Sequence, residues 1–193
     1  MNTNKKNCSY FLAVITEVGK ESVVTGNVKR PILKAKCYDS NGEIAEISII
    51  FSSISQIRKA VAYEVGDILY FSAYIGECPE DNLAFYPRTV HLIKKSKLDE
   101  DEEISEGFVK SRLLPYMSES NQVLFEGIVC NTNGSTSSIM IKNPQLMRGE
   151  CSEYSHIWTK HPPISVEKGD EVMFVGDVTS NGLFGQIYKT ETN

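Results

Sequence analysis

The residues of this chain best suited to chemistry lie in a short stretch of its last third. Four such side chains occupy alternate positions there: Tyr154, His156, Trp158 and Lys160. Side chains two positions apart on a β-strand share one side of a sheet, so this spacing places two aromatic rings, an imidazole and an amine in one row. Such a row could stack nucleobases on its rings while Lys160 contacts a phosphate.

The residues between these four do not decide whether the row faces the core or the outside of the protein. Ser155, Ile157 and Thr159 would make a thin hydrophobic core if they faced inward. Trp and Tyr are largely buried in most proteins, and that tendency favours the orientation in which Tyr154 and Trp158 face inward. Three interpretations remain at this stage: the aromatic side chains pack in the core, they stack on bases, or they contact another protein.

A second candidate row lies in the first half of the chain. Lys34, Lys36 and Tyr38 alternate with apolar residues, which is typical of a strand with a basic outer face and an apolar inner one. Lys29 and Arg30 in the preceding loop add further positive charge. These five residues are therefore candidate nucleic-acid contacts. The alternative is a strand whose charged side chains are merely solvated.

Motifs for catalysis are missing from the sequence. The three histidines, His91, His156 and His161, have neither the HExxH nor the cysteine-flanked spacing of a metal site. No GxSxG nucleophile motif and no glycine-rich phosphate-binding loop is found. The sequence therefore predicts a protein that is not an enzyme and that needs no metal and no cofactor.

An internal sequence repeat predicts how the chain is organised. The stretch that begins at Gly66-Asp67 aligns without a gap with the one that begins at Gly169-Asp170. In each copy the Gly-Asp turn precedes a run of alternating apolar residues, then a turn, then a second apolar run. This pattern is typical of a β-hairpin, and its repetition predicts two copies of one fold.

Charge divides the chain into three parts. Residues 1–97 hold 13 Lys+Arg and 10 Asp+Glu, residues 98–120 hold 2 and 7, and residues 121–193 hold 5 and 8. The middle part contains the carboxylate run 99–103, followed by apolar residues with helical spacing up to Pro115. We therefore predict a first domain at 1–97, an acidic linker with a short helix at 98–120, and a second domain at 121–193.

Strand signals recur in the same order in both predicted domains. In the first domain we expect strands at 10–18, 32–38, 43–51, 68–75 and 83–93, with a helix that ends near residue 62, after the third strand. In the second we expect strands at 122–131, 137–142, 151–159, 171–178 and 183–188, where His161-Pro162-Pro163 replaces the helix. This order resembles the oligonucleotide/oligosaccharide-binding (OB) fold, which implies an all-β protein of two small five-stranded barrels.

The resemblance extends distantly to bacterial single-stranded-DNA-binding proteins and implies a function. It implies a non-catalytic protein that binds single-stranded nucleic acid, with DNA expected over RNA, and that is accessory to replication or recombination. The formal net charge of −5 favours an alternative, a protein-interaction subunit whose barrels dock on a polymerase, a helicase or another partner. A binder of nucleic acid should lose affinity steeply as salt rises, whereas an apolar docking surface should not.

Cysteine usage and hydropathy bear on where the protein works. The five cysteines, an odd number, are widely scattered and form no CxxC pair. A reducing compartment is therefore expected, and we predict a cytoplasmic location. The sequence contains no apolar run of transmembrane length, so no membrane partner is expected.

Overall fold

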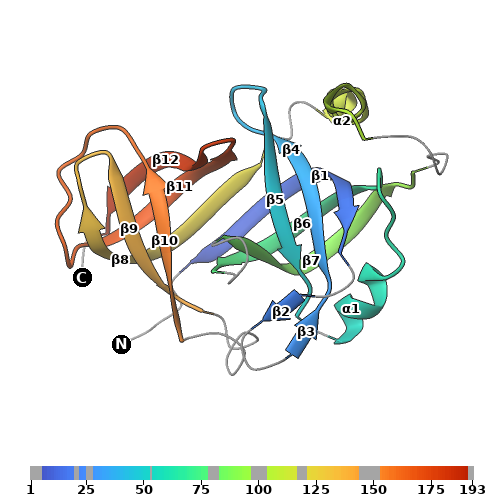
Figure 1. The fold of residues 1–193 in the computed structure, drawn as a ribbon. Helices are drawn as coiled ribbons and strands as arrows, with labels where there is room; N and C mark the ends of the chain where they lie inside the picture. The colour runs from blue at the N-terminus through green and yellow to red at the C-terminus, as the bar shows by residue number, and fades with distance from the viewer. Residues whose placement is uncertain are drawn as a thin grey trace.

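Strands make up most of the chain (Figure 1). The computed structural model describes residues 6–19, 22–24, 28–52, 54–77, 83–96, 104–116, 121–143 and 153–190. The first half contains β1 (Asn7–Val18), β2 (Ser22–Val24), β3 (Val28–Arg30), β4 (Ile32–Tyr38), β5 (Ile44–Ile50), α1 (Ile54–Ala60), β6 (Ile68–Gly76) and β7 (Ala84–Lys94). The rest contains α2 (Glu106–Leu113), the 3-10 turn η1 (Leu114–Tyr116), β8 (Gln122–Thr132), β9 (Thr136–Lys142), β10 (Tyr154–Lys160), β11 (Glu171–Thr179) and β12 (Gly182–Lys189).

Five strands of the first half close into a ring. Their hydrogen-bonded order is β1-β4-β5-β7-β6, and β6 pairs back to β1. The backbone pairing of β5 with β7 consists of the single pair Ile49 and Phe85, so the ring is only narrowly closed by hydrogen bonds there. Aromatic packing fills the interior, where the Phe11 ring centroid lies 5.1 Å from that of Phe71 and 4.4 Å from that of Phe85. The predicted helix after the third strand is confirmed as α1.

The second half repeats this arrangement. Its strands follow the order β8-β9-β10-β12-β11, with β11 paired back to β8. If the five strands of each ring are numbered in chain order, the order of neighbouring strands around both rings is first, second, third, fifth, fourth. Residues 161–170 contain no helix, as predicted, and Val166 from this segment is buried in the core instead. The stacked rings of Phe125 and Phe174, 5.1 Å apart, repeat the aromatic packing of the first ring.

The Gly-Asp turns confirm the internal repeat in atomic detail. Gly66 and Gly169 adopt φ angles of +87° and +97°, a left-handed conformation that favours glycine. Each glycine N–H donates to a carbonyl of the first strand of its own ring, at 2.7 and 2.8 Å. Asp67 and Asp170 each accept a hydrogen bond from the backbone N–H three positions earlier, at 3.0 and 2.8 Å. The same sequence signal therefore builds the same turn twice.

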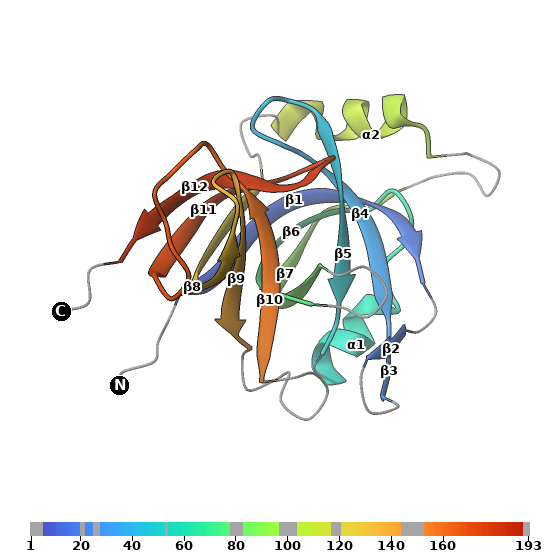
Figure 2. The same ribbon diagram turned by 60° about the vertical axis from the view of Figure 1, so that its left-hand side comes forward.

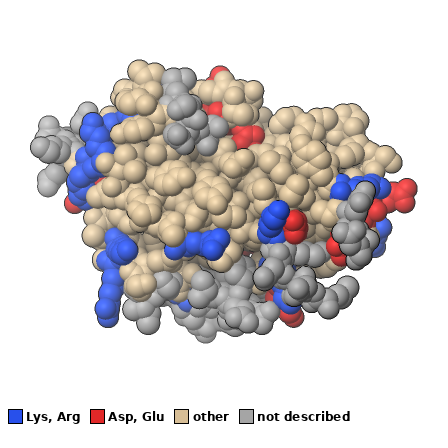
Figure 3. All heavy atoms as spheres, turned by 180° about the vertical axis from the view of Figure 1, so that it is seen from behind, with Lys and Arg blue, Asp and Glu red and all other residues tan. Residues whose placement is uncertain are grey.

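Backbone pairing joins the two rings. The antiparallel pairing of β1 with β8 matches Asn7–Tyr10 with Gln122–Phe125. As a result β7, β6, β1, β8, β11 and β12 follow one another in a single sheet (Figure 2). Seen from behind, the middle of the molecule is almost without charged side chains (Figure 3).

Side chains reinforce this junction. The buried Asn121 amide nitrogen donates to the carbonyls of Tyr38 and Val178 at 2.7 and 3.1 Å, and its oxygen accepts from the Val178 N–H at 2.6 Å. The Ser40 N–H donates to the Asp177 carboxylate at 2.6 Å. The rings therefore contact each other directly. The division into domains at 1–97 and 121–193, with a linker between them, stays a prediction.

The predicted short helix between the rings is confirmed as α2. The Ser105 hydroxyl caps its N-terminus by accepting a hydrogen bond from the Phe108 N–H at 3.1 Å. Val109 and Leu113 on one side of the helix are buried in a cluster with Leu12, Val14, Tyr38 and Ile68 of the first ring. The helix is therefore docked on that ring. The carboxylate run 99–103 lies outside the described residues.

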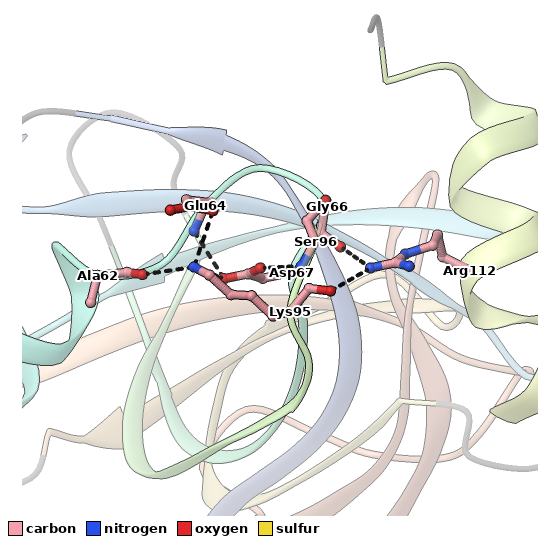
Figure 4. Close-up of polar contacts among 7 residues, drawn as sticks. All are labelled: Ala62, Glu64, Gly66, Asp67, Lys95, Ser96 and Arg112. Atoms are coloured by element: carbon pink, nitrogen blue, oxygen red, sulfur yellow. Dashed lines mark hydrogen bonds and ion pairs between the residues drawn. The ribbon is translucent and has the colours of Figure 1, made fainter. Parts of the chain in front are cut away.

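A cluster of polar contacts around the Gly66-Asp67 turn binds the residues just after β7 and a side chain of α2 (Figure 4). The fully buried Asp67 carboxylate accepts hydrogen bonds from Lys95 Nζ at 3.2 Å and from the Ser96 N–H at 2.7 Å. Arg112 of α2 donates to the carbonyls of Gly66 and Lys95 at 3.1 and 3.4 Å. Desolvation opposes the protonated form of Lys95, but its bonds to the carboxylates outweigh that effect and raise the pKa of the ammonium group. The chain just after β7 and the last turn of α2 are thus both bonded to the Gly66-Asp67 turn.

Candidate nucleic-acid interface

Strand β10 presents the predicted row of Tyr154, His156, Trp158 and Lys160 on its outer side. All four side chains are exposed, whereas the three residues between them are buried. Trp158 is 59% exposed and Tyr154 is 41% exposed. The interpretation in which these two rings pack in the core is therefore wrong. Binding by stacking or by contact with a protein remains.

The inner side of β10 accounts for this orientation. Ile157 joins the hydrophobic core, and the two small polar residues beside it are satisfied by hydrogen bonds. The Ser155 hydroxyl donates to the Asn143 side-chain oxygen at 2.8 Å, and the Thr159 hydroxyl donates to the Ser137 carbonyl at 3.2 Å. Buried hydroxyl groups cost little once they are paired. A polar inner side is therefore compatible with an aromatic outer side.

Neighbouring strands widen the face around the row. Opposite Tyr154, His156 and Trp158, strand β9 places Lys142, Met140 and Ser138. On the other side Lys160 pairs with Phe184 of β12, whose ring is 46% exposed. The sequence interpretation missed Phe184 and Lys142. Leu183 and Ile187 are an even number of positions apart and share the buried side of β12, so the period of two could have placed Phe184 on the other side.

Charges on this face are few. The Lys142 ammonium lies 3.8 Å from the Glu153 carboxylate at the start of β10, which partly neutralises it. Lys160 lies at the other end of the row, and its side chain is exposed. The arrangement can therefore stack two or three flat rings and attract one negative group near Lys160.

The predicted row of the first ring is smaller than the sequence indicated. Lys34 and Lys36 of β4 are half-buried on the outer side. Lys34 Nζ donates to the Ser48 hydroxyl at 2.7 Å, and Lys36 lies opposite Glu46 in the register of β4 and β5. Tyr38 differs from the prediction: α2 covers it, only 7% of it is exposed, and its hydroxyl donates to the Lys110 carbonyl at 3.4 Å. Tyr38 therefore cannot stack on a base.

Of the two basic residues in the predicted loop, Lys29 and Arg30, only the Arg30 side chain is described. Arg30 is 8% exposed and its guanidinium donates to the Ser52 carbonyl, so it anchors the chain instead of reaching toward solvent. The Lys29 side chain lies outside the described residues. Figures 1 and 2 show β4 and β5 on the same side of the molecule as β9 and β10.

Two observations on the polar side chains of the described residues concern metal binding and nucleophilic chemistry. They include no cluster of three His, Cys, Asp or Glu side chains that could hold a metal ion. His161 Nε2 lies 2.8 Å from the Ser137 hydroxyl, a distance typical of a base and its nucleophile. Both residues are buried, at 3% and 0% exposed, so this bond fixes the end of β10 and is closed to a substrate. None of the described helices is long and apolar enough to cross a membrane.

Comparison with known proteins supports the fold. No protein-family model and no curated protein matches the sequence. The wild-type single-stranded DNA binding protein from Thermus aquaticus matches with a TM-score of 0.54 and 9% identity, over 98% of this chain and 95% of that chain. A deletion mutant of that protein gives a TM-score of 0.54 and 10% identity, over 98% and 96%. This chain therefore has, over nearly its whole length, the fold of that single-stranded DNA binding protein, and the resemblance predicted from the sequence is confirmed at the level of fold.

Proposed function

We propose that this protein binds single-stranded nucleic acid, with DNA the expected form, on the outer face of β10. One observation carries the proposal: Tyr154 and Trp158 are large aromatic side chains held in solvent on one side of a strand, with Lys160 beside them. Exposed rings on a sheet are suited to stacking on unpaired bases, whatever the base sequence. A duplex hides its base faces, so this face favours single strands.

The first ring would add contacts to the phosphate backbone. Lys34 and Lys36 lie on the outer side of β4, and no aromatic ring accompanies them because α2 covers Tyr38. Lysines hold a phosphate backbone without reading its sequence. We therefore assign base stacking to the second ring and a weaker electrostatic role to the first. An accessory role in replication or recombination would suit such sequence-tolerant binding.

Fluorescence anisotropy tests the proposal. Labelled single-stranded and double-stranded oligonucleotides of equal length should be titrated with the protein over a salt series. We expect tighter binding of the single strand and an affinity that falls as salt rises, since bound lysines release counterions. Equal affinity for both forms, or no binding at low salt, would contradict the proposal.

A protein-interaction subunit is the second candidate, and a separate surface favours it. The sheet face seen from behind in Figure 3 carries few charges, and Tyr10, Tyr70 and Tyr188 on its strands are 41%, 37% and 51% exposed. Exposed tyrosines on an uncharged face are typical of protein interfaces. Partner binding through this face should change little between low and high salt, which separates it from binding of nucleic acid.

A further inference from the structure

Strand β10, which carries the aromatic row, has one incomplete edge. It pairs with β9 along its full length, but with β12 only at Thr159 and Lys160. The odd-numbered residues at its two ends hydrogen-bond toward β9, since Asn143 N–H donates to the Glu153 carbonyl and His161 N–H to the Ser135 carbonyl. Backbone groups alternate in direction along a strand, so the His156 N–H points away from β9. No strand of the described residues reaches it there.

A side chain of the first ring fills this gap. Glu77 follows β6, and its carboxylate accepts a hydrogen bond from the His156 N–H at 3.0 Å. Its own N–H donates to the hydroxyl of the buried Ser155 at 3.2 Å, and its carbonyl accepts from the Tyr86 hydroxyl at 3.0 Å. The carboxylate takes the place of the carbonyl acceptor that a neighbouring strand would supply. Because this acceptor is charged, the hydrogen bond is stronger than one to a neutral carbonyl.

We infer that Glu77 is a positioning residue for the aromatic row. It closes the open edge of β10 and fixes the row relative to the first ring, so that binding by the second ring depends on a residue of the first. This inference rests on the proposed function of the row. The Glu77 side chain also places a negative charge at the edge of the strand that carries the row, which would repel a phosphate, so its effect on geometry and its effect on charge oppose each other.

Three full-length variants separate geometry from charge. Glu77→Ala removes the hydrogen bond and the charge, whereas Glu77→Gln keeps an acceptor oxygen and removes only the charge. Glu153→Ala is the matched control, because it removes a carboxylate at the start of β10 that bonds to Lys142 and not to the backbone. Affinity for a labelled single-stranded oligonucleotide and amide hydrogen exchange of the free proteins over 153–160 are measured for each.

We expect Glu77→Ala to lower affinity about tenfold, on the scale of one lost charge-assisted hydrogen bond. It should also speed amide exchange over 153–160. Glu77→Gln should retain slow exchange and bind at least as tightly as the unmodified protein, and Glu153→Ala should not lose affinity. Exchange over 153–160 that is unchanged in Glu77→Ala would overturn the inference.

The two readouts also separate this inference from the proposed function. If the unmodified protein binds and Glu77→Ala binds as tightly as Glu77→Gln, which lacks the same charge, the positioning role is refuted and the function stands. If the unmodified protein binds no oligonucleotide, the function fails, and the exchange measurement still decides whether Glu77 holds β10.

Discussion

Replacing Trp158 with alanine gives the sharpest test of the β10 face. Trp158 is the only tryptophan of the chain, so its fluorescence reports on one position. Because the ring is 59% exposed, we expect its emission to change when an oligonucleotide stacks on it. We also expect Trp158→Ala to weaken binding while the protein remains folded.

The two effects have different magnitudes. Stacking of one base on an aromatic ring contributes about 1–3 kcal/mol, which corresponds to a loss of about 5- to 150-fold in affinity. The contribution to stability follows from burial: with 59% exposed, about 100 Å² of the side chain is covered. At about 25 cal/mol per Å², and with a compact unfolded state, the free energy of unfolding should fall by no more than about 2 kcal/mol. A fully buried tryptophan would cost about 3–5 kcal/mol.

Measuring both quantities on the same protein decides the assignment. Anisotropy with a labelled single-stranded oligonucleotide gives affinity, and urea unfolding gives stability. Trp158→Phe should recover part of the affinity, since it keeps a ring. Tyr188→Ala is the matched control, because Tyr188 is similarly exposed on β12 but lies outside the row. A Trp158→Ala variant that retains full affinity would refute the stacking role.

Three further predictions concern the rest of the molecule. Charge reversal of Lys34 and Lys36 should weaken binding of all oligonucleotide sequences and flatten the salt dependence measured by anisotropy, whereas reversal of buried Arg30 should lower the urea midpoint. Brief proteolysis should cut within 98–120, and the two fragments should co-elute in gel filtration because β1 and β8 pair. Burial raises the pKa of Cys37 from 9.0 to about 12, so its thiol should resist alkylation at pH 8, and the free energy of unfolding should fall as pH rises from 9 toward 12. A Cys37→Ala variant should show less of that fall.

Local patterns predicted the fold well, because alternation and turns are properties of neighbouring residues. The strand at 32–38 was predicted with its observed bounds, and the turns at Gly66 and Gly169 form as their shared sequence indicated. Contacts between residues far apart in the sequence could not be predicted from such local patterns. The orientation of Trp158 depends on Asn143 and Ser137, which satisfy the polar inner side of β10.

The candidate site of the first ring shows the same limit. The alternation on β4 placed Tyr38 correctly on the outer side of its strand, but α2 arrives about 70 positions later and covers it. The basic loop likewise indicated an exposed Arg30, whereas a carbonyl acceptor at Ser52 draws the guanidinium into the structure. A single sequence contains no local signal for either partner.

The pairing of β1 with β8 has a consequence for how the protein forms in the cell. Tyr10 and Gln122 are neighbours in the sheet but 112 positions apart in the chain. At a synthesis rate of about 5–20 residues per second, the ribosome needs roughly 6–22 seconds to make the second partner after the first. During that interval the stretch of β1 that pairs with β8, Asn7–Tyr10, has no native partner on that edge. A nascent or truncated first half therefore exposes a free strand edge, which makes it prone to pairing with other chains until synthesis brings β8.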